Sequence, residues 1–146
     1  MMKLSVYRLR HPHSLSRGQR QRLAVASILS MEPGIIVLDE PTTGQDRGHL
    51  NKFLARMKML NEAGKTIILI SHDMGVVAEY ASRTIVMKDG GILIDADTRE
   101  IFSHPDILEE ASIEPHLLAR ACNDVRKVGR DIPVMLTLEE LERYVG

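Results

Sequence analysis

Two short apolar runs, separated by a helical pattern and each followed by polar residues, constrain the fold of this chain most strongly. Ile35 to Leu38 leads into Asp39-Glu40-Pro41, and Thr66 to Ile70 leads into Ser71-His72-Asp73. A continuous apolar run of this length predicts a strand buried on both faces. Alternating strands and helices predict an α/β fold with parallel strands and right-handed crossovers. In such folds ligands bind at the carboxyl ends of the strands, where these polar residues lie.

Helical patterns fill the segments around the two strands. They predict helices over about residues 16–31, 47–61 and 73–81. Ser16 can cap the first of these helices, and Glu32-Pro33-Gly34 stops it because proline disfavours helical geometry in the residue before it. Gly64 ends the second helix.

The remainder of the chain predicts a hairpin followed by a helical tail. Residues 84–88 and 92–95 flank Asp89-Gly90-Gly91, which predicts a β-hairpin. From Thr98 onward the pattern is helical, with Pro115 suited to a first helical turn. Thr137 and Glu140 predict a capping box at the start of the last helix. The apolar stripe of that helix is expected to pack on the core, and the alternative is packing on a sister subunit. The stripe consists of Leu138, Leu141 and Val145.

Composition excludes several classes of partner. The 146 residues carry 19 basic and 20 acidic side chains, and the aromatic residues are three Tyr and two Phe, so neither charge nor stacking indicates nucleic acid. No apolar stretch approaches the roughly 18 residues that a membrane-spanning helix needs, and the N-terminus does not resemble a signal peptide. The single Cys122 suits a reducing compartment, where it is expected to be a buried apolar residue. These features predict a cytoplasmic protein.

An acidic pair follows the first predicted strand. Asp39 can order a magnesium ion through water, and Glu40 can polarise a nucleophilic water. The alternative interpretation is a solvated strand end, because acidic residues are common there. His72 has a similar ambiguity, since a histidine at a strand end can simply cap the next helix.

The segment Leu15-Ser16-Arg17-Gly18-Gln19 opens the first helix with a serine hydroxyl and free backbone N–H groups. Such a helix start is a preformed anion site that can hold a terminal phosphate. The alternative interpretation is a plain helix cap.

In order and spacing, these segments resemble the ABC ATPase family. The signature is LSRGQRQR, the Walker B strand IIVLDEP, the D-loop TTGQD, and the switch histidine lies in LISHD. The resemblance covers about residues 13–95 and implies a partial P-loop NTPase core. It makes residues 1–97 the C-terminal part of an ABC ATPase domain and residues 98–146 a helical appendage. The EPTTGQD sequence and the helical tail resemble those of the ATPases of energy-coupling-factor importers for cobalt, nickel or vitamins.

The resemblance implies a role for each residue of the signature and D-loop. Ser16 and Gly18 would contact the γ-phosphate of ATP held by the opposite subunit, and Gln19 belongs to the same loop. Arg17 stands where the commonest signature has glycine and would add a cation beside the phosphate. Asp46 would contact the opposite subunit across the dimer interface.

The resemblance also implies the catalytic roles. Glu40 would be the general base, and Asp39 would hold Mg²⁺ through water. His72 would sense the γ-phosphate and fix the geometry of attack.

The sequence departs from the family most severely in lacking the phosphate-binding loop. The 146 residues contain no G-x-x-x-x-G-K-[ST] motif and no Q-loop segment. Gly64-Lys65-Thr66 is not a substitute, because it precedes a strand and cannot form the phosphate-cradling turn. In the family's sheet the missing strand lies between the switch-histidine strand and the strand at residues 84–88, so both are expected to face a gap. The chain alone is therefore not expected to hydrolyse ATP.

We expect an ATP-binding and ATP-hydrolysing subunit of an importer, or a piece of one. The expected partners are another ABC ATPase subunit, as homodimer or heterodimer, and an integral membrane subunit that holds the chain at the inner face of the membrane. Two alternatives are a non-catalytic half that donates Ser16 and Asp46, and a regulatory module acting through its tail. A soluble ABC protein of DNA repair or translation is a further alternative, although neither coiled-coil heptads nor a basic patch support it.

Overall fold

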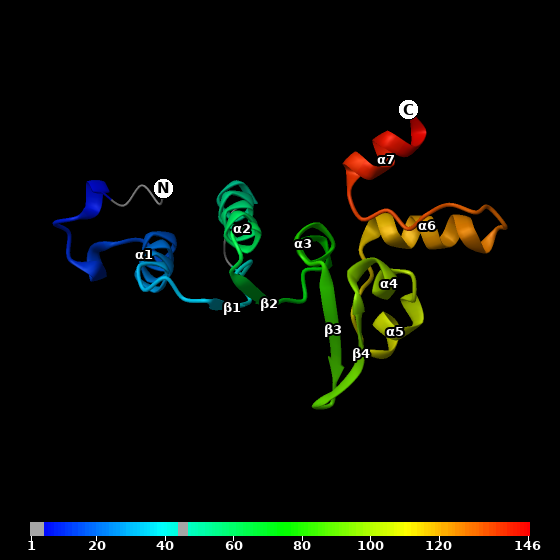
Figure 1. Ribbon diagram of the computed structural model, residues 1–146, viewed down its shortest axis with the longest axis horizontal. Coiled ribbons are helices and arrows are strands. Elements are labelled where there is room, and N and C mark those ends of the chain that lie inside the picture. The colour runs from blue at the N-terminus through cyan, green and yellow to red at the C-terminus, as the bar shows by residue number, and fades with distance from the viewer. Residues whose placement is uncertain (1–4, 44–46) are drawn as a thin grey trace. The chain divides into compact units, whose positions relative to one another are not determined.

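The computed structural model describes residues 5–43 and 47–146, and the chain divides into two compact units at Ile68 and Leu69 (Figure 1). The first unit contains two short 3₁₀ turns, α1 (Arg17–Leu29), β1 (Ile35–Asp39), α2 (Arg47–Glu62) and the start of β2 (Thr66–Ile70). The second contains the rest of β2, α3 (Met74–Tyr80), β3 (Arg83–Lys88), β4 (Gly91–Asp97), α4 (Thr98–Phe102), α5 (Pro105–Glu110), α6 (Leu117–Lys127) and α7 (Leu138–Val145).

The predicted strand, helix, strand order is confirmed. β1 and β2 form one two-stranded sheet, and the Thr66 N–H donates to the Gly34 carbonyl at 2.9 Å. This bond joins the residue before β1 to the first residue of β2, so the strands run parallel. The intervening α2 ends at Gly64, whose φ of 90° is a left-handed conformation that glycine adopts without strain.

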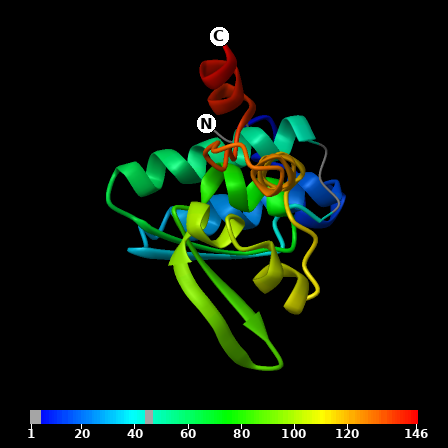
Figure 2. The same cartoon turned by 90° about the vertical axis from the view of Figure 1, so that its right-hand side faces the viewer.

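The expectation that β1 is buried on both faces is wrong. Ile36 and Leu38 are buried, whereas Ile35 and Val37 are 62% and 59% exposed. β2 likewise alternates between exposed and half-buried positions. Figures 1 and 2 show α2 to one side of β1. A continuous apolar run indicates that both faces of a strand can be buried. It does not indicate which face the helices of the chain cover.

The predicted hairpin is confirmed as β3 and β4, which pair antiparallel. Asp89 and Gly90 connect them with φ values of 50° and 78°, the two positive values of a type I′ turn. The guanidinium of Arg83 donates two bonds to the Asp95 carboxylate, at 2.7 and 2.6 Å, and so joins the strands at their far ends. Because β3 pairs only with β4 among the described strands, the two sheets are separate.

One core unites the second unit. Apolar side chains come from α3, β3, α4, α5, α6 and the segment before α7: Met74, Val77, Ala78, Val86, Ile101, Phe102, Leu108, Ala119, Val134 and Leu136. Members of this core lie on both sides of the expected boundary between residues 97 and 98. That boundary stays a prediction about family domains, but the division between compact units lies elsewhere, at 68/69.

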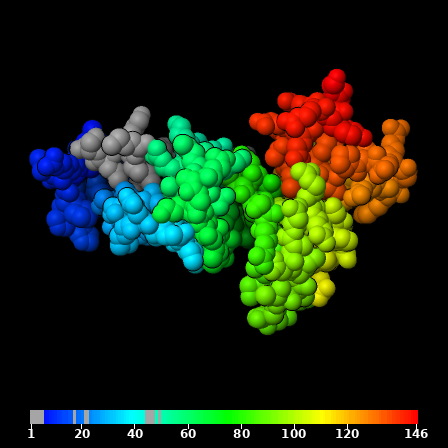
Figure 3. Space-filling model, in the orientation of Figure 1, coloured from blue at the N-terminus to red at the C-terminus, as the bar shows by residue number. Residues whose placement is uncertain are grey.

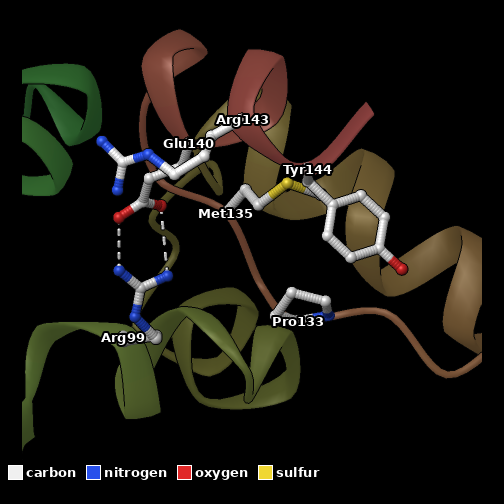
Figure 4. Close-up of a pocket in the computed structure, with 6 residues that line it drawn as sticks. All are labelled: Arg99, Pro133, Met135, Glu140, Arg143 and Tyr144. Carbon is white, nitrogen blue, oxygen red and sulfur yellow. Dashed lines mark hydrogen bonds and ion pairs between the residues drawn. The ribbon is translucent and has the colours of Figure 1, made fainter. Parts of the chain in front are cut away.

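The start of α7 differs from the predicted capping box. Thr137 Oγ1 accepts from the Glu140 N–H at 3.3 Å, as predicted. The Glu140 carboxylate, however, accepts from the Leu136 N–H at 2.8 Å and from the Arg99 guanidinium at 2.6 and 3.2 Å. Figure 4 shows the two charged groups facing each other from α4 and α7. The carboxylate thus accepts from the backbone one residue before the N-cap and binds a cation as well, in place of the reciprocal cap.

The apolar stripe of α7 does not pack on the core as expected. Leu138 and Val145 are exposed, and Leu141 is half-buried. α7 lies on the outside of the second unit, as the space-filling view shows (Figure 3). Cys122 is buried, as predicted, whereas Pro115 lies before α6 instead of in its first turn.

We expect Glu140 to stabilise the tail in a pH-dependent manner. The hydrogen bond from Arg99 holds the pKa of Glu140 below its ordinary value of 4.5, against the opposing effect of burial. A lowered folded-state pKa stabilises the fold fully above pH 4.5, and this stabilisation is lost as the pH falls through the lowered value. Since the side chain is partly exposed, Glu140→Gln is expected to cost about 1 kcal/mol at pH 7.

Thermal melts at pH 7 and pH 3 check this expectation. The midpoint of Glu140→Gln should lie a few degrees below that of the unsubstituted chain at pH 7, and the gap should narrow at pH 3. Glu139→Gln, at the exposed neighbouring position, is the matched control. A gap of equal size at both pH values would contradict the assigned role of the carboxylate.

Candidate functional site

The predicted signature residues lie at the N-terminus of α1, where they form a capping box. The Gln19 N–H donates to Ser16 Oγ at 3.3 Å, and the Ser16 N–H donates to Gln19 Oε1 at 2.9 Å. The Gln19 side chain also donates to the Tyr7 hydroxyl at 3.1 Å. Sequence reasoning identified the serine cap but missed this role of Gln19, although the S-x-x-Q spacing signals it.

This helix start is open to an incoming anion. Ser16 is exposed, and a Cβ placed on Gly18 would meet no other residue within 4 Å. Arg17 begins α1, but its side chain lies outside the described residues. The dipole of a 13-residue helix favours negative charge at this position.

The acidic pair lies at the carboxyl end of β1. Asp39 is the last residue of the strand and is exposed, whereas Glu40 is half-buried. Glu40 has a φ of 44°, and its carbonyl accepts from the Thr43 N–H at 3.2 Å. A left-handed backbone is uncommon for a residue other than glycine, and such conformations gather at functional sites. The turn places two adjacent carboxylates in different environments.

His72 lies in the second unit, in the loop after β2. It is exposed, and hydrogen bonds hold the backbone that follows it. Ser71 Oγ accepts from the Asp73 N–H at 3.0 Å, and Asp73 Oδ1 accepts from the N–H groups of Gly75 and Val76 at 3.1 and 3.2 Å. Asp73 is thus the N-cap of α3, so the alternative interpretation of His72 as a cap does not apply.

The structure brings together Ser16 with Gln19 and places Asp39 next to Glu40. Asp46 lies outside the described residues. Among those described, no three His, Cys, Asp or Glu side chains form a group that could hold a metal ion. The exposed carboxylate of Asp39 fits Mg²⁺ in another manner, because Mg²⁺ usually keeps several waters and takes one or two carboxylates beside phosphate oxygens.

A pocket of about 280 Å³ lies within the tail of the second unit, and none of the candidate residues lines it. Pro133, Met135 and Tyr144 line it together with Arg99, Glu140 and Arg143 (Figure 4). In the part of the chain that the structure describes, no helix combines the length and the apolar character required to cross a bilayer.

Comparison with known proteins gives one consistent family. The model of the ABC transporter family matches residues 2–43. The "Putative ABC transporter ATP-binding protein" of Methanosarcina mazei is 61% identical over 145 residues, which is 99% of this chain and 25% of that protein. The energy-coupling factor transporter ATP-binding protein EcfA of Methanothermobacter thermautotrophicus is 36% identical over 137 residues, 94% of this chain and 44% of that protein. The chain thus spans between a quarter and somewhat under half of these relatives.

Solved structures agree with these relatives. The cbiO1 protein of Clostridium perfringens, part of the ABC transporter complex cbiONQ, has a TM-score of 0.56 at 32% identity, over 80% of this chain and 45% of that one. The dimeric ATP-binding cassette MJ0796 with ADP and Pi has a TM-score of 0.55 at 38% identity, over 60% and 38% of the two chains. The mixed α/β fold is therefore that of the P-loop NTPase domain of ABC ATPases. Together these findings show that the chain belongs to the ABC transporter ATP-binding family, as a C-terminal part of its ATP-binding domain.

Proposed function

We propose that these residues supply the signature, Walker B and switch-histidine parts of an ATPase that powers an importer. The observation that carries the proposal is the turn at Glu40, which sets a half-buried carboxylate in a left-handed backbone directly after the exposed Asp39. The two proposed roles differ, because a general base takes a proton from the attacking water, whereas a metal partner binds Mg²⁺ through water.

The proposed chemistry is attack of water on the γ-phosphate of ATP. Glu40 orients this water and accepts its proton, while the exposed His72 donates a hydrogen bond to the γ-phosphate. Asp39 would hold Mg²⁺ through water, and the ion would neutralise charge on the β- and γ-phosphates. The phosphate-binding loop must come from a segment other than these 146 residues, because their sequence contains no G-x-x-x-x-G-K-[ST] motif.

The importer is proposed from the relatives, and its cargo is proposed from the sequence resemblance. One relative is named as an energy-coupling factor transporter protein, and one solved neighbour is part of an ABC transporter complex. We propose a metal ion or a vitamin as the cargo, an integral membrane subunit as one partner, and a cytoplasmic position at the membrane through that subunit. The second ABC ATPase subunit is proposed because a solved neighbour is a dimer.

A second candidate function is donation of the signature to a complete subunit. The capping box favours it, because Ser16 is presented at the start of α1 by contacts that the chain makes itself. In this case Ser16 and Gly18 would contact ATP held by the partner, and Asp46 would make contacts at the interface between the subunits.

Hydrolysis of Mg-ATP by the chain alone, and mixed with a complete relative, tests both functions. The most informative partner subunit keeps its phosphate-binding loop but has its own signature serine replaced by arginine. Only Ser16 of this chain can then complete the ATP site of that subunit. We expect the chain alone to be inactive and the mixture to hydrolyse ATP. Ser16→Arg should reduce the rate of the mixture by about 100-fold or more, because it blocks the phosphate-binding helix start.

Ser30→Arg is the matched control, since Ser30 is the C-cap of the same helix, where a cation is favourable. It should leave the rate unchanged. Equal loss with both variants would contradict signature donation, and rapid hydrolysis by the chain alone would contradict the need for a separate phosphate-binding segment.

A further inference from the structure

His116 is a partly buried histidine to which the proposed function gives no role. It is the N-cap of α6, but its side chain makes no capping bond. Its Nδ1 atom is buried and has no hydrogen-bond partner among the described residues. A buried polar atom without a partner destabilises the fold, so burial of this nitrogen needs a physical reason. The residues that surround the His116 ring indicate what that reason could be.

The ring of His116 joins the tail to the first turn of α3. On one side it meets Phe102 of α4 edge-on, with ring centroids 6.3 Å apart and planes at 77°. On another side its Cδ2 atom lies 3.9 Å from where a Cβ of Gly75 would stand, and Asp73 Oδ1 lies 3.2 Å from the same point. The imidazole therefore lies beside the cap that begins α3.

That cap directly follows His72. Asp73 holds the N–H groups of Gly75 and Val76, and its own N–H donates to Ser71 on the other side of His72. A shift at Gly75 would therefore reach the backbone on both sides of His72 through two local hydrogen bonds. α3 also shares its core with α4, α5 and α6, so the tail and this loop belong to one packed body.

We propose that His116 is a positioning residue for the His72 loop. Its ring, packed against Phe102, supports the first turn of α3 and thereby sets the conformation of the backbone that presents His72. The tail thus controls the geometry of the switch histidine. This role in ATP hydrolysis rests on the proposed function, whereas the coupling itself is a property of the second unit.

Nuclear magnetic resonance of the full chain tests the coupling without nucleotide. The two measurements are the Cε1–Hε1 signal of His72, assigned with His72→Gln, and the amide exchange rate of Val76. In His116→Ala we expect the His72 signal to move and Val76 to exchange about tenfold faster or more, because the cap loses its support. His116→Phe keeps the planar ring and removes the buried Nδ1, so it should restore both measurements to within about twofold of the original.

His104→Ala is the matched control, because His104 is also an N-cap without a capping bond, at the start of α5. It should leave both measurements unchanged. If His116→Ala does not fold, His116→Leu replaces it, since leucine keeps the apolar volume but not the flat ring; the His72 signal should again move.

An unchanged His72 signal in the folded Ala or Leu variant would overturn the proposal, as would an equal change in His104→Ala. Since no ATP is present, these outcomes are independent of the proposed function. Loss of hydrolysis in mixtures would count against that function and leave the coupling intact.

Discussion

Glu40→Gln is expected to lower ATP hydrolysis by about 10²- to 10⁴-fold while ATP still binds, once a half-domain bearing G-x-x-x-x-G-K-[ST] is supplied. Glutamine has nearly the size and shape of glutamate but cannot accept the proton of the attacking water. The left-handed backbone at residue 40 is retained, since the substitution changes only the end of the side chain. The loss should therefore appear in kcat and not in the affinity for ATP.

Rates and ATP affinities of the reconstituted domain check this prediction, with Glu32→Gln as the control. Glu32 also has a positive φ, of 49°. It lies shortly before β1, whereas Glu40 lies directly after this strand. Its substitution should change the rate by less than about twofold, because surface changes away from the chemistry have small effects. A Glu40→Gln domain that keeps its rate would remove Glu40 from the role of general base.

Leu108→Ala is expected to destabilise the second unit by about 2–5 kcal/mol. Leu108 is 1% exposed and belongs to the core that α3, β3 and the tail share. Removing its methyl groups loses apolar burial and leaves a cavity that the surrounding helices fill incompletely. Since whole domains are stable by only about 5–15 kcal/mol, the change is a large fraction of the total.

Denaturant melts and hydrogen exchange check this prediction, with Leu117→Ala as the control. Leu117 is 79% exposed at the start of α6, so the same substitution should cost less than about 0.5 kcal/mol. In Leu108→Ala the amides of α3 should lose protection together with those of α6, because one core holds both helices. If α3 kept its protection, the tail would be a separate appendage, with its boundary at 97/98.

Several local features could be predicted because neighbouring residues alone decide them. The serine cap at Ser16 and the stop at Gly64 depend on side-chain and backbone preferences within a few residues. The two-residue hairpin turn at Asp89 and Gly90 is likewise a local choice, because both residues accept positive φ. The order of strands and helices followed from the spacing of apolar residues.

Features that depend on distant partners could not be predicted in the same manner. Glu140 was expected to complete a local cap, but its carboxylate accepts from the Leu136 N–H and from Arg99, which lies 41 positions earlier in the chain. The stripe of Leu138 and Val145 was expected to be buried, yet both are exposed. An amphipathic pattern identifies the apolar face of a helix, but the surface available to cover that face depends on the packing of the whole unit.

The sequence by itself determined the family motifs, the α/β order and the identity of the candidate residues, because these depend on residue type and spacing along the chain. Only the tertiary structure decided that β1 leaves one face open and that His116 lies beside the cap following His72. The physical reason is the same in each case. Burial, strain and side-chain contacts depend on segments that are distant in sequence and meet only when the chain has folded.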